Sequence, residues 1–247
     1  MIMKAYDIHS HYNHNVEGDT KTDELYRCDV SFLIEERKRL GISCMAACSF
    51  ASVLNKNSIF DENNHCFQLA LKNDFIYQWV VIDPQDKRTY EQANNMMASN
   101  KCLGIKIHSI YHGYNILDYV DEMFCYANEH HLTVLMHPDH ILEVAEIADK
   151  YPHMNLIIAH IGSLDHINAI KNAKNGNIYT DTSGVASSNN NIIEYAVKEI
   201  GSNKILFGTD TYSAAFQLGR ILLANISEVD KNNILFKNAK KLFKGKL

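Results

Sequence analysis

The chain has 247 residues, of which 46% are hydrophobic and 21% are charged, and its net charge is −5 at pH 7. These values are ordinary for a globular protein that buries its own core, and they argue against nucleic acid or an anionic membrane as a partner. The six cysteines form no Cys-x-x-Cys pair, and no signal-like or membrane-spanning run is present. We therefore expect a cytoplasmic protein that forms a single domain over residues 1–247.

Short β-rich segments alternate with amphipathic segments along the whole chain. The sequence predicts eight strands, over Lys4–His9, Ile42–Ser49, Phe75–Asp83, Cys102–His108, Leu132–His137, Asn155–His160, Asn177–Asp181 and Lys204–Asp210. It predicts helices between them over Val30–Leu40, Asp86–Asn100, Leu117–His130, His140–Lys150 and Asn191–Ile200, and an extra C-terminal helix over Glu228–Phe243.

This alternation is typical of βαβ units and a parallel sheet, and eight strands in a chain of this length favour closure into a (β/α)8 TIM barrel. We expect the last helix to pack across the outside of that barrel. An open doubly wound sheet is the structural alternative. It is disfavoured because no Gly-rich phosphate loop follows the first expected strand, which runs into Ser10 and His11.

Polar residues close several of the expected strands, at the barrel end where TIM-barrel active sites lie. His9 and His11 follow the first strand, and because residues two apart share a strand face, both can project into the barrel mouth as neighbouring ligands of one ion. His137 closes the fifth strand, His160 the sixth and Asp210 the eighth. Imidazoles together with a carboxylate suit zinc or a similar divalent ion, so we predict one such ion, with manganese as the alternative to zinc.

Strand alternation also places His160 in line with Ile158 and Leu156, and Gly208 is small enough to let a metal or substrate approach beside Asp210. A histidine considered alone is more commonly a surface or core residue. We therefore assign no role to six further histidines, namely His14, His65, His130, His131, His153 and His166.

As an ordered set, these segments make the chain similar to the amidohydrolase superfamily, in particular to the amidohydrolase-related branch that includes aminocarboxymuconate semialdehyde decarboxylase. The segments that carry the resemblance are Tyr6–His11, Gly104–His108, Leu135–Pro138, Ile158–Gly162, Tyr179–Gly184, Ile205–Asp210 and Asn233–Ala239. The resemblance implies that His9, His11 and His137 are metal ligands and that Asp210 is a ligand or a proton acceptor. It also implies that His160 lies beside the metal-bound water or the substrate.

The fourth expected strand departs from the TatD-like nuclease branch, which carries a glutamate there, because this chain offers Lys106 and His108. A substrate carboxylate would have to rely on Lys106, His108, tyrosines, Arg27 or the metal. Lys106 has three alternatives: a cation that binds substrate, a carbamylated bridge between two metals, or a structural ion pair. We favour the first. Asp181 either orients a ligand or caps a turn.

We interpret the protein as a metal-dependent hydrolase in which a metal-activated water attacks an amide, lactone or ester of a small metabolite. His160 and Asp210 would transfer protons, with Lys106 as a third catalytic group, and Lys106 and His108 would bind the substrate. The alternative is a metal-dependent decarboxylase or hydratase that uses the same site on a small carboxylic acid. A barrel that binds a ligand without turnover is a weaker alternative. We expect a small-molecule substrate and neither nucleic acid nor membrane as a partner, and a homo-oligomer is left open.

Overall fold

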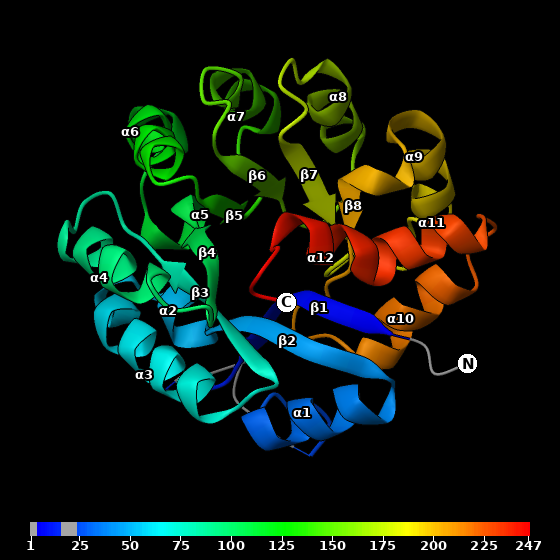
Figure 1. The fold of residues 1–247 in the computed structure, drawn as a ribbon, viewed down its shortest axis with the longest axis horizontal. Coiled ribbons are helices and arrows are strands. Elements are labelled where there is room, and N and C mark those ends of the chain that lie inside the picture. The colour runs from blue at the N-terminus through cyan, green and yellow to red at the C-terminus, as the bar shows by residue number, and fades with distance from the viewer. Residues whose placement is uncertain (1–3, 16–23) are drawn as a thin grey trace.

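The computed structural model describes residues 4–15 and 24–247. In these residues eight parallel strands form one sheet in the order β1 to β8. Figure 1 shows the strands arranged around a central axis with the helices outside them. The prediction of a TIM barrel is confirmed. The strands are β1 (Ala5–Tyr12), β2 (Ile42–Ser49), β3 (Ile76–Val81), β4 (Cys102–Ile107), β5 (Thr133–Met136), β6 (Asn155–Ile158), β7 (Ile178–Asp181) and β8 (Ile205–Leu206).

The seam between β8 and β1 completes the ring. The backbone N–H of Ile8 donates to the carbonyl of Phe207 at 3.0 Å. The carbonyl of His9 accepts from the backbone N–H groups of Thr209 and Asp210, at 3.0 and 2.8 Å. The first and last expected site segments are therefore hydrogen-bonded neighbours, although about 200 residues separate them in sequence.

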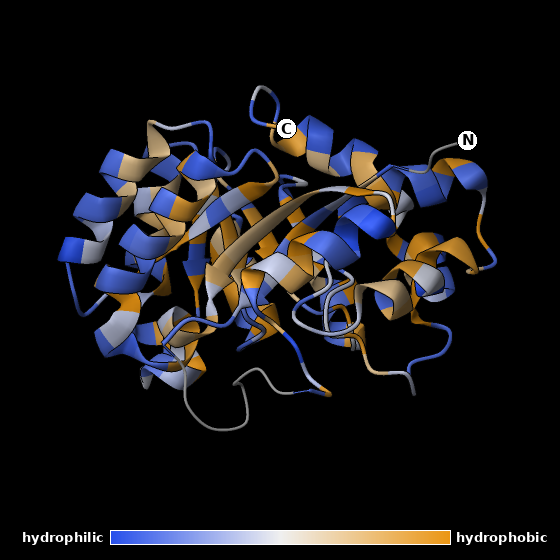
Figure 2. Ribbon diagram, turned by 90° about the horizontal axis from the view of Figure 1, so that it is seen from below, coloured by the Kyte–Doolittle hydropathy of each residue, from blue (hydrophilic) through white to orange (hydrophobic). Residues whose placement is uncertain are grey.

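The helices follow the strands and bury one face against them. They are α1 (Val30–Arg39), α2 (Phe50–Leu54), α3 (Ile59–Lys72), α4 (Arg88–Met97), α5 (Ser109–His112), α6 (Ile116–Glu129), α7 (Ile141–Ala148), α8 (Leu164–Asn172), α9 (Ile192–Ile200), α10 (Ala214–Leu222), α11 (Glu228–Asn232) and α12 (Asn238–Leu242). Figure 2 shows apolar residues where the helices meet the strands and polar residues on the outer helix faces. None of the helices in the described part of the chain has the length and hydrophobicity that crossing a bilayer requires.

Side chains on β4 separate the two layers of the core. Ile105 and Ile107 belong to the apolar layer beneath the helices, as expected, whereas Lys106 points into the barrel. Gly104 is required where the strands crowd. A Cβ atom at this position would lie 2.0 Å from the carbonyl oxygen of Thr133 and 2.8 Å from the ring of Trp79.

The C-terminal segment differs from the continuous helix expected over Glu228–Phe243. A π-helical segment, Asn233–Lys237, separates α11 from α12. The segment covers the end of the barrel at which the strands begin, and Figure 1 shows α12 lying across the ring of strands. Phe243 meets Trp79 edge-on, with ring centroids 5.8 Å apart. Apolar residues inside the barrel are thereby closed off at this end.

Candidate metal centre

The two β1 histidines both point into the barrel mouth, as expected. Their Nε2 atoms lie 3.3 Å apart. His11 stacks on Phe50, with ring centroids 5.2 Å apart, and its Nδ1 lies 3.3 Å from the carbonyl oxygen of Cys48. The register of β1 against β2 shifts between Asp7 and Ser10, as it does at a β-bulge.

Asp181 at the end of β7 holds His9 from behind. The Nδ1–H of His9 donates to Asp181 Oδ2 at 3.0 Å, which leaves the Nε2 lone pair of His9 facing the mouth. Burial and the Lys106 ammonium lower the pKa of His9 to about 4, against the opposing charge of Asp181. Burial alone would raise the pKa of Asp181, but His9 and Ser183 hold it well below its usual value. Asp181 therefore orients a histidine, and it also caps the turn after β7, because its Oδ1 accepts from the backbone N–H of Ser183 at 2.8 Å.

His160 reaches the mouth by a different route from the one that strand alternation predicts. Ile157 and Ala159 lie in the inner apolar cluster, whereas Leu156 and Ile158 lie in the outer one, so continued alternation would point His160 outward. Its φ of +61° turns the side chain inward. The ring centroids of His160 and His9 lie 4.9 Å apart, and the Nδ1–H of His160 donates to the carbonyl of Ser183 at 2.9 Å.

Asp210 follows β8 and also has a left-handed backbone, with φ of +57°. Its Oδ1 lies 3.8 Å from Nε2 of His11. The sequence predicts that Gly208 makes room for a metal or substrate, but the side chains of His9 and Ser183 occupy that space. A Cβ atom there would lie 2.9 Å from Cβ of His9 and 3.1 Å from Cβ of Ser183.

His137 and His108 form the opposite wall of the mouth. Their rings stack with centroids 4.2 Å apart, and Nδ1 of each is buried without a hydrogen-bond partner among the described residues. Burial and the nearby Lys106 ammonium lower the pKa of His137 to about 3 and that of His108 further still. Both rings are therefore neutral near pH 7. His108 can donate or accept a hydrogen bond but does not supply a positive charge.

Lys106 lies fully buried in the middle of these groups. Its Nζ is 3.1 Å from Nε2 of His9, and within the described ranges it forms no ion pair with a carboxylate. Burial lowers its pKa from the usual value. Arg27, another of the candidates for a substrate carboxylate, instead pairs with Asp29 at the protein surface, at 2.9 Å.

The residues gathered here fit a divalent cation. His9, His160 and Asp181 offer ligand atoms that all lie within 4.8 Å of one another. Of the four residues expected to be ligands, this group contains only His9, and His11, His137 and Asp210 lie around it. The unsatisfied Nδ1 of His137 and the inward Nε2 of His9 are the donors that such an ion requires.

Two contributors were not singled out from the sequence. Ser183 places its hydroxyl 2.9 Å from Nδ1 of both His9 and His160. Arg37 is buried behind β1, where it pairs with Asp7 at 2.7 Å and donates to Thr209 across the β8 seam. Ser183 lies inside the resembling segment Tyr179–Gly184, which is the one signal that pointed to it. Arg37 lies in the middle of a charged helix face and carries no such signal.

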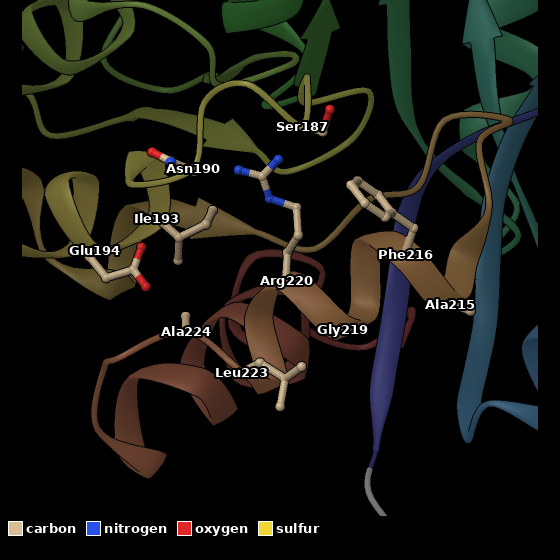
Figure 3. Close-up of a pocket in the computed structure, with 10 residues that line it drawn as sticks. All are labelled: Ser187, Asn190, Ile193, Glu194, Ala215, Phe216, Gly219, Arg220, Leu223 and Ala224. Atoms are coloured by element: carbon tan, nitrogen blue, oxygen red, sulfur yellow. The ribbon is translucent and has the colours of Figure 1, made fainter.

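A separate hollow of about 470 Å³ lies between α9 and α10, and it includes none of the residues above (Figure 3). Arg220 in this hollow donates to the carbonyls of Ala186 and Asn189, at 2.8 and 2.5 Å. It thereby fixes the segment after β7 that continues from Ser183.

The sequence matches the family described as amidohydrolase over residues 6–245. The chain belongs to the amidohydrolase family. The resemblance found in the sequence is therefore confirmed, and the protein is an enzyme of this superfamily. No curated protein matches the chain.

Solved structures share the fold over nearly the full length of both chains. The 2,6-dihydroxybenzoate decarboxylase of Rhizobium has a TM-score of 0.76 at 16% identity, covering 97% of this chain and 98% of that one. The 5-carboxyvanillate decarboxylase of Sphingomonas paucimobilis has a TM-score of 0.76 at 14% identity, with the same coverage. A dihydroxybenzoic acid decarboxylase of Polaromonas, with bound manganese and the inhibitor 2-nitroresorcinol, has a TM-score of 0.76 at 15% identity, covering 97% and 96%.

These comparisons correct the interpretation of the protein as a hydrolase, because the three structures just named are decarboxylases. They favour the alternative reaction. The error has a physical reason: hydrolysis and decarboxylation draw on the same histidines, carboxylate and metal at the strand ends, so these residues cannot separate the two. Zinc is likewise not confirmed, since the Polaromonas structure holds manganese.

Proposed function

We propose that the protein is a metal-dependent decarboxylase of a small carboxylic acid. The observation that carries this proposal is Lys106, whose fully buried amino group has no carboxylate partner in the described part of the chain. Buried charges are normally paired, because an isolated one loses its hydration without compensation. A carboxylate substrate in the mouth would supply the missing anion. The decarboxylase activity of the structures with the same fold supports this choice of reaction.

We assign His9, His11, His137 and Asp210 as the residues that would hold one divalent ion, zinc or manganese. The bound ion would polarise a substrate oxygen and offset the negative charge that develops as carbon dioxide leaves. Asp181 fixes the His9 ring so that Nε2 faces the mouth.

Metal binding and the role of Lys106 are linked through one atom. Lys106 Nζ donates to His9 Nε2, and this is the lone pair that a metal ligand must use. The ammonium and a metal cannot share it. With His9 Nε2 used as a metal ligand, Lys106 would be free to contact the substrate carboxylate. His108 borders the same space as a neutral hydrogen-bonding group.

Decarboxylation breaks the bond between the carboxylate and its carbon and leaves an electron pair there, which must take up a proton. Asp210 and His160 are the acid–base groups in reach of the mouth. His160 donates its Nδ1–H to Ser183, so its Nε2 carries the lone pair that can accept or return a proton. We assign these two residues to proton transfer.

The test is a panel of small carboxylic acids, including hydroxylated benzoic acids, incubated with protein loaded with Mn²⁺ or Zn²⁺. We expect release of carbon dioxide and, in D₂O, one deuterium at the carbon that lost the carboxylate. Lys106→Met should raise KM for the acid, whereas exposed Lys72→Met on α3 should not. Turnover of amides or lactones with no acid decarboxylated would overturn the proposal, and addition of water without release of carbon dioxide would indicate a hydratase.

A further inference from the structure

A second group of metal-ligand residues lies outside the barrel mouth. Glu62 and His65 are three residues apart on α3, so they project from the same face of the helix. His14 meets them from the segment that follows β1. The three side chains offer ligand atoms that all lie within 4.8 Å of one another. We assigned no role to His14 and His65 from the sequence, since nothing there shows that the two histidines meet.

The hydrogen-bond partners of the Glu62 carboxylate are a histidine and a neutral amide. Nδ1 of His14 lies 2.9 and 3.0 Å from the two carboxylate oxygens of Glu62, and the Asn15 amide donates to one of them at 3.0 Å. The rings of His14 and His65 stack with centroids 3.5 Å apart and planes 7° apart. Nδ1 of His65 lies 3.0 Å from the hydroxyl of Tyr12.

Glu62 is the unusual member, because its side chain is only 2% exposed and, over residues 4–15 and 24–247, it pairs with no lysine or arginine. Buried carboxylates are found paired with cations or coordinating metals. The His14 side chain is 34% exposed, which gives an ion a path to the buried carboxylate. Glu-x-x-His on a helix is also the spacing by which carboxylate-bridged metal sites take two ligands from one helix.

We propose that His14, Glu62 and His65 bind a second divalent cation of the first transition row, separate from the ion at the barrel mouth. Two imidazoles and a carboxylate are the ligand types that zinc, cobalt or manganese accept, and water completes the coordination. The hydrogen bond between the Tyr12 hydroxyl and His65 Nδ1 occupies that nitrogen, which leaves Nε2 of His65 for the ion and fixes the orientation of the ring.

The cation would tie α3 to the segment after β1. Tyr12 directly follows His11 in β1, so its contact with His65 joins the second site to the strand that carries the first. The expected effect is to hold the end of β1 in place, without contact with the substrate. This site does not rest on the proposed decarboxylase function.

The test counts metal in the full chain. Protein stripped with chelator, reconstituted with Zn²⁺ and desalted should hold close to two equivalents. His14→Ala should lose one equivalent, and His9→Ala/His11→Ala should lose the other. His153→Ala, at an exposed histidine elsewhere, is the matched control and should retain both. A His14→Ala variant that holds as much metal as the wild type would overturn the proposal.

A second readout removes the barrel-mouth site from the measurement. In the His9→Ala/His11→Ala background, Zn²⁺ should still raise Tm, because an ion that binds only the folded state stabilises it. Adding His14→Ala should abolish that rise. If the rise persists after His14→Ala, the ion binds elsewhere, and His14 and Glu62 form only a hydrogen-bonded pair.

Discussion

The two ends of the barrel are built on opposite principles. At the end where the strands begin, Trp79 and Phe243 pack edge-on beneath α12 in an apolar cluster. At the other end, buried histidines and a buried lysine surround the mouth, and His160 and Asp210 hold left-handed backbones that cost free energy. One end is arranged for packing and the other for chemistry.

The apolar packing at the closed end stabilises the fold, and this stabilisation offsets the unfavourable free energy of the residues at the mouth. Neutral histidines crowded around an ammonium, and two non-glycine residues at positive φ, are each unfavourable in the folded state. They persist because the surrounding strands and the Arg37–Asp7 pair behind β1 fix their positions. Changes at the closed end should therefore alter stability alone, whereas changes at the mouth should alter activity and stability in opposite directions.

The largest effect is expected from Phe243→Ala. Removing a ring that is 3% exposed leaves a cavity beside Trp79, and such truncations cost about 3–5 kcal/mol of unfolding free energy. Urea denaturation measures it, with Leu223→Ala, at 88% exposure, as a control that should change stability by less than about 0.5 kcal/mol. Folded Phe243→Ala should retain its metal content. Loss of metal in that variant would show that the two ends are coupled.

Low pH should decrease the unfolding free energy of the metal-free protein, because His9 at the mouth is buried in its neutral form. The pKa of His9 is about 4 in the folded state, below the ordinary value of 6.5, so between these values the unfolded chain binds a proton that the folded one does not. Stability is fully present above about pH 6.5 and falls as the pH drops toward 4, by on the order of 3 kcal/mol. Chelator-treated protein unfolded by urea between pH 4 and 8 tests this. The same slope in His9→Gln would contradict it.

Asp210→Asn should lower the catalytic rate while leaving the left-handed backbone at this position intact. Asparagine adopts a left-handed backbone readily, so the fold should survive at φ of +57°. The lost acid–base group should lower kcat on the acid substrate by about 10²-fold or more, equivalent to about 2.7 kcal/mol. Steady-state kinetics with the metal-loaded protein measures it. Unchanged kcat would mean that Asp210 transfers no proton.

Much of this arrangement follows from local sequence patterns. The alternation of apolar strands and amphipathic segments predicted the eight strands, and the strand-end residues predicted which side chains reach the mouth. Side-chain alternation placed Lys106 inside the barrel, opposite to Ile105 and Ile107, as the structure shows. These features depend on neighbours within a few residues.

The remaining features depend on contacts between distant segments. The left-handed turn at His160 reversed the face expected for it, and no local pattern announces such a turn at a histidine. The space beside Gly208 is occupied by His9, which lies about 200 residues earlier in the chain. The approach of His14 to Glu62 likewise appears only once β1 and α3 lie side by side. The predicted reaction, hydrolysis, was wrong because the same side chains serve both hydrolysis and decarboxylation.

Lys106→Met should give the smallest change in free energy and the sharpest test of the contrast between the two ends. A methionine keeps the length of the side chain and needs no counter-ion. Because Lys106 is buried without an ion-pair partner in the described part of the chain, we expect the metal-free variant to gain about 1–2 kcal/mol of unfolding free energy at pH 7. Metal-loaded protein should instead lose activity, since the cation for the substrate carboxylate is gone.

The pH dependence of that gain identifies its cause. Burial lowers the pKa of Lys106 below the ordinary value of 10.5, so just below that value the unfolded chain binds a proton that the folded one has already lost. Wild-type stability therefore rises with pH in this window, whereas Lys106→Met lacks the contribution. The advantage of the variant should shrink as the pH approaches 10. An advantage that stays constant with pH would mean that better packing, and not removal of a buried charge, stabilises the variant.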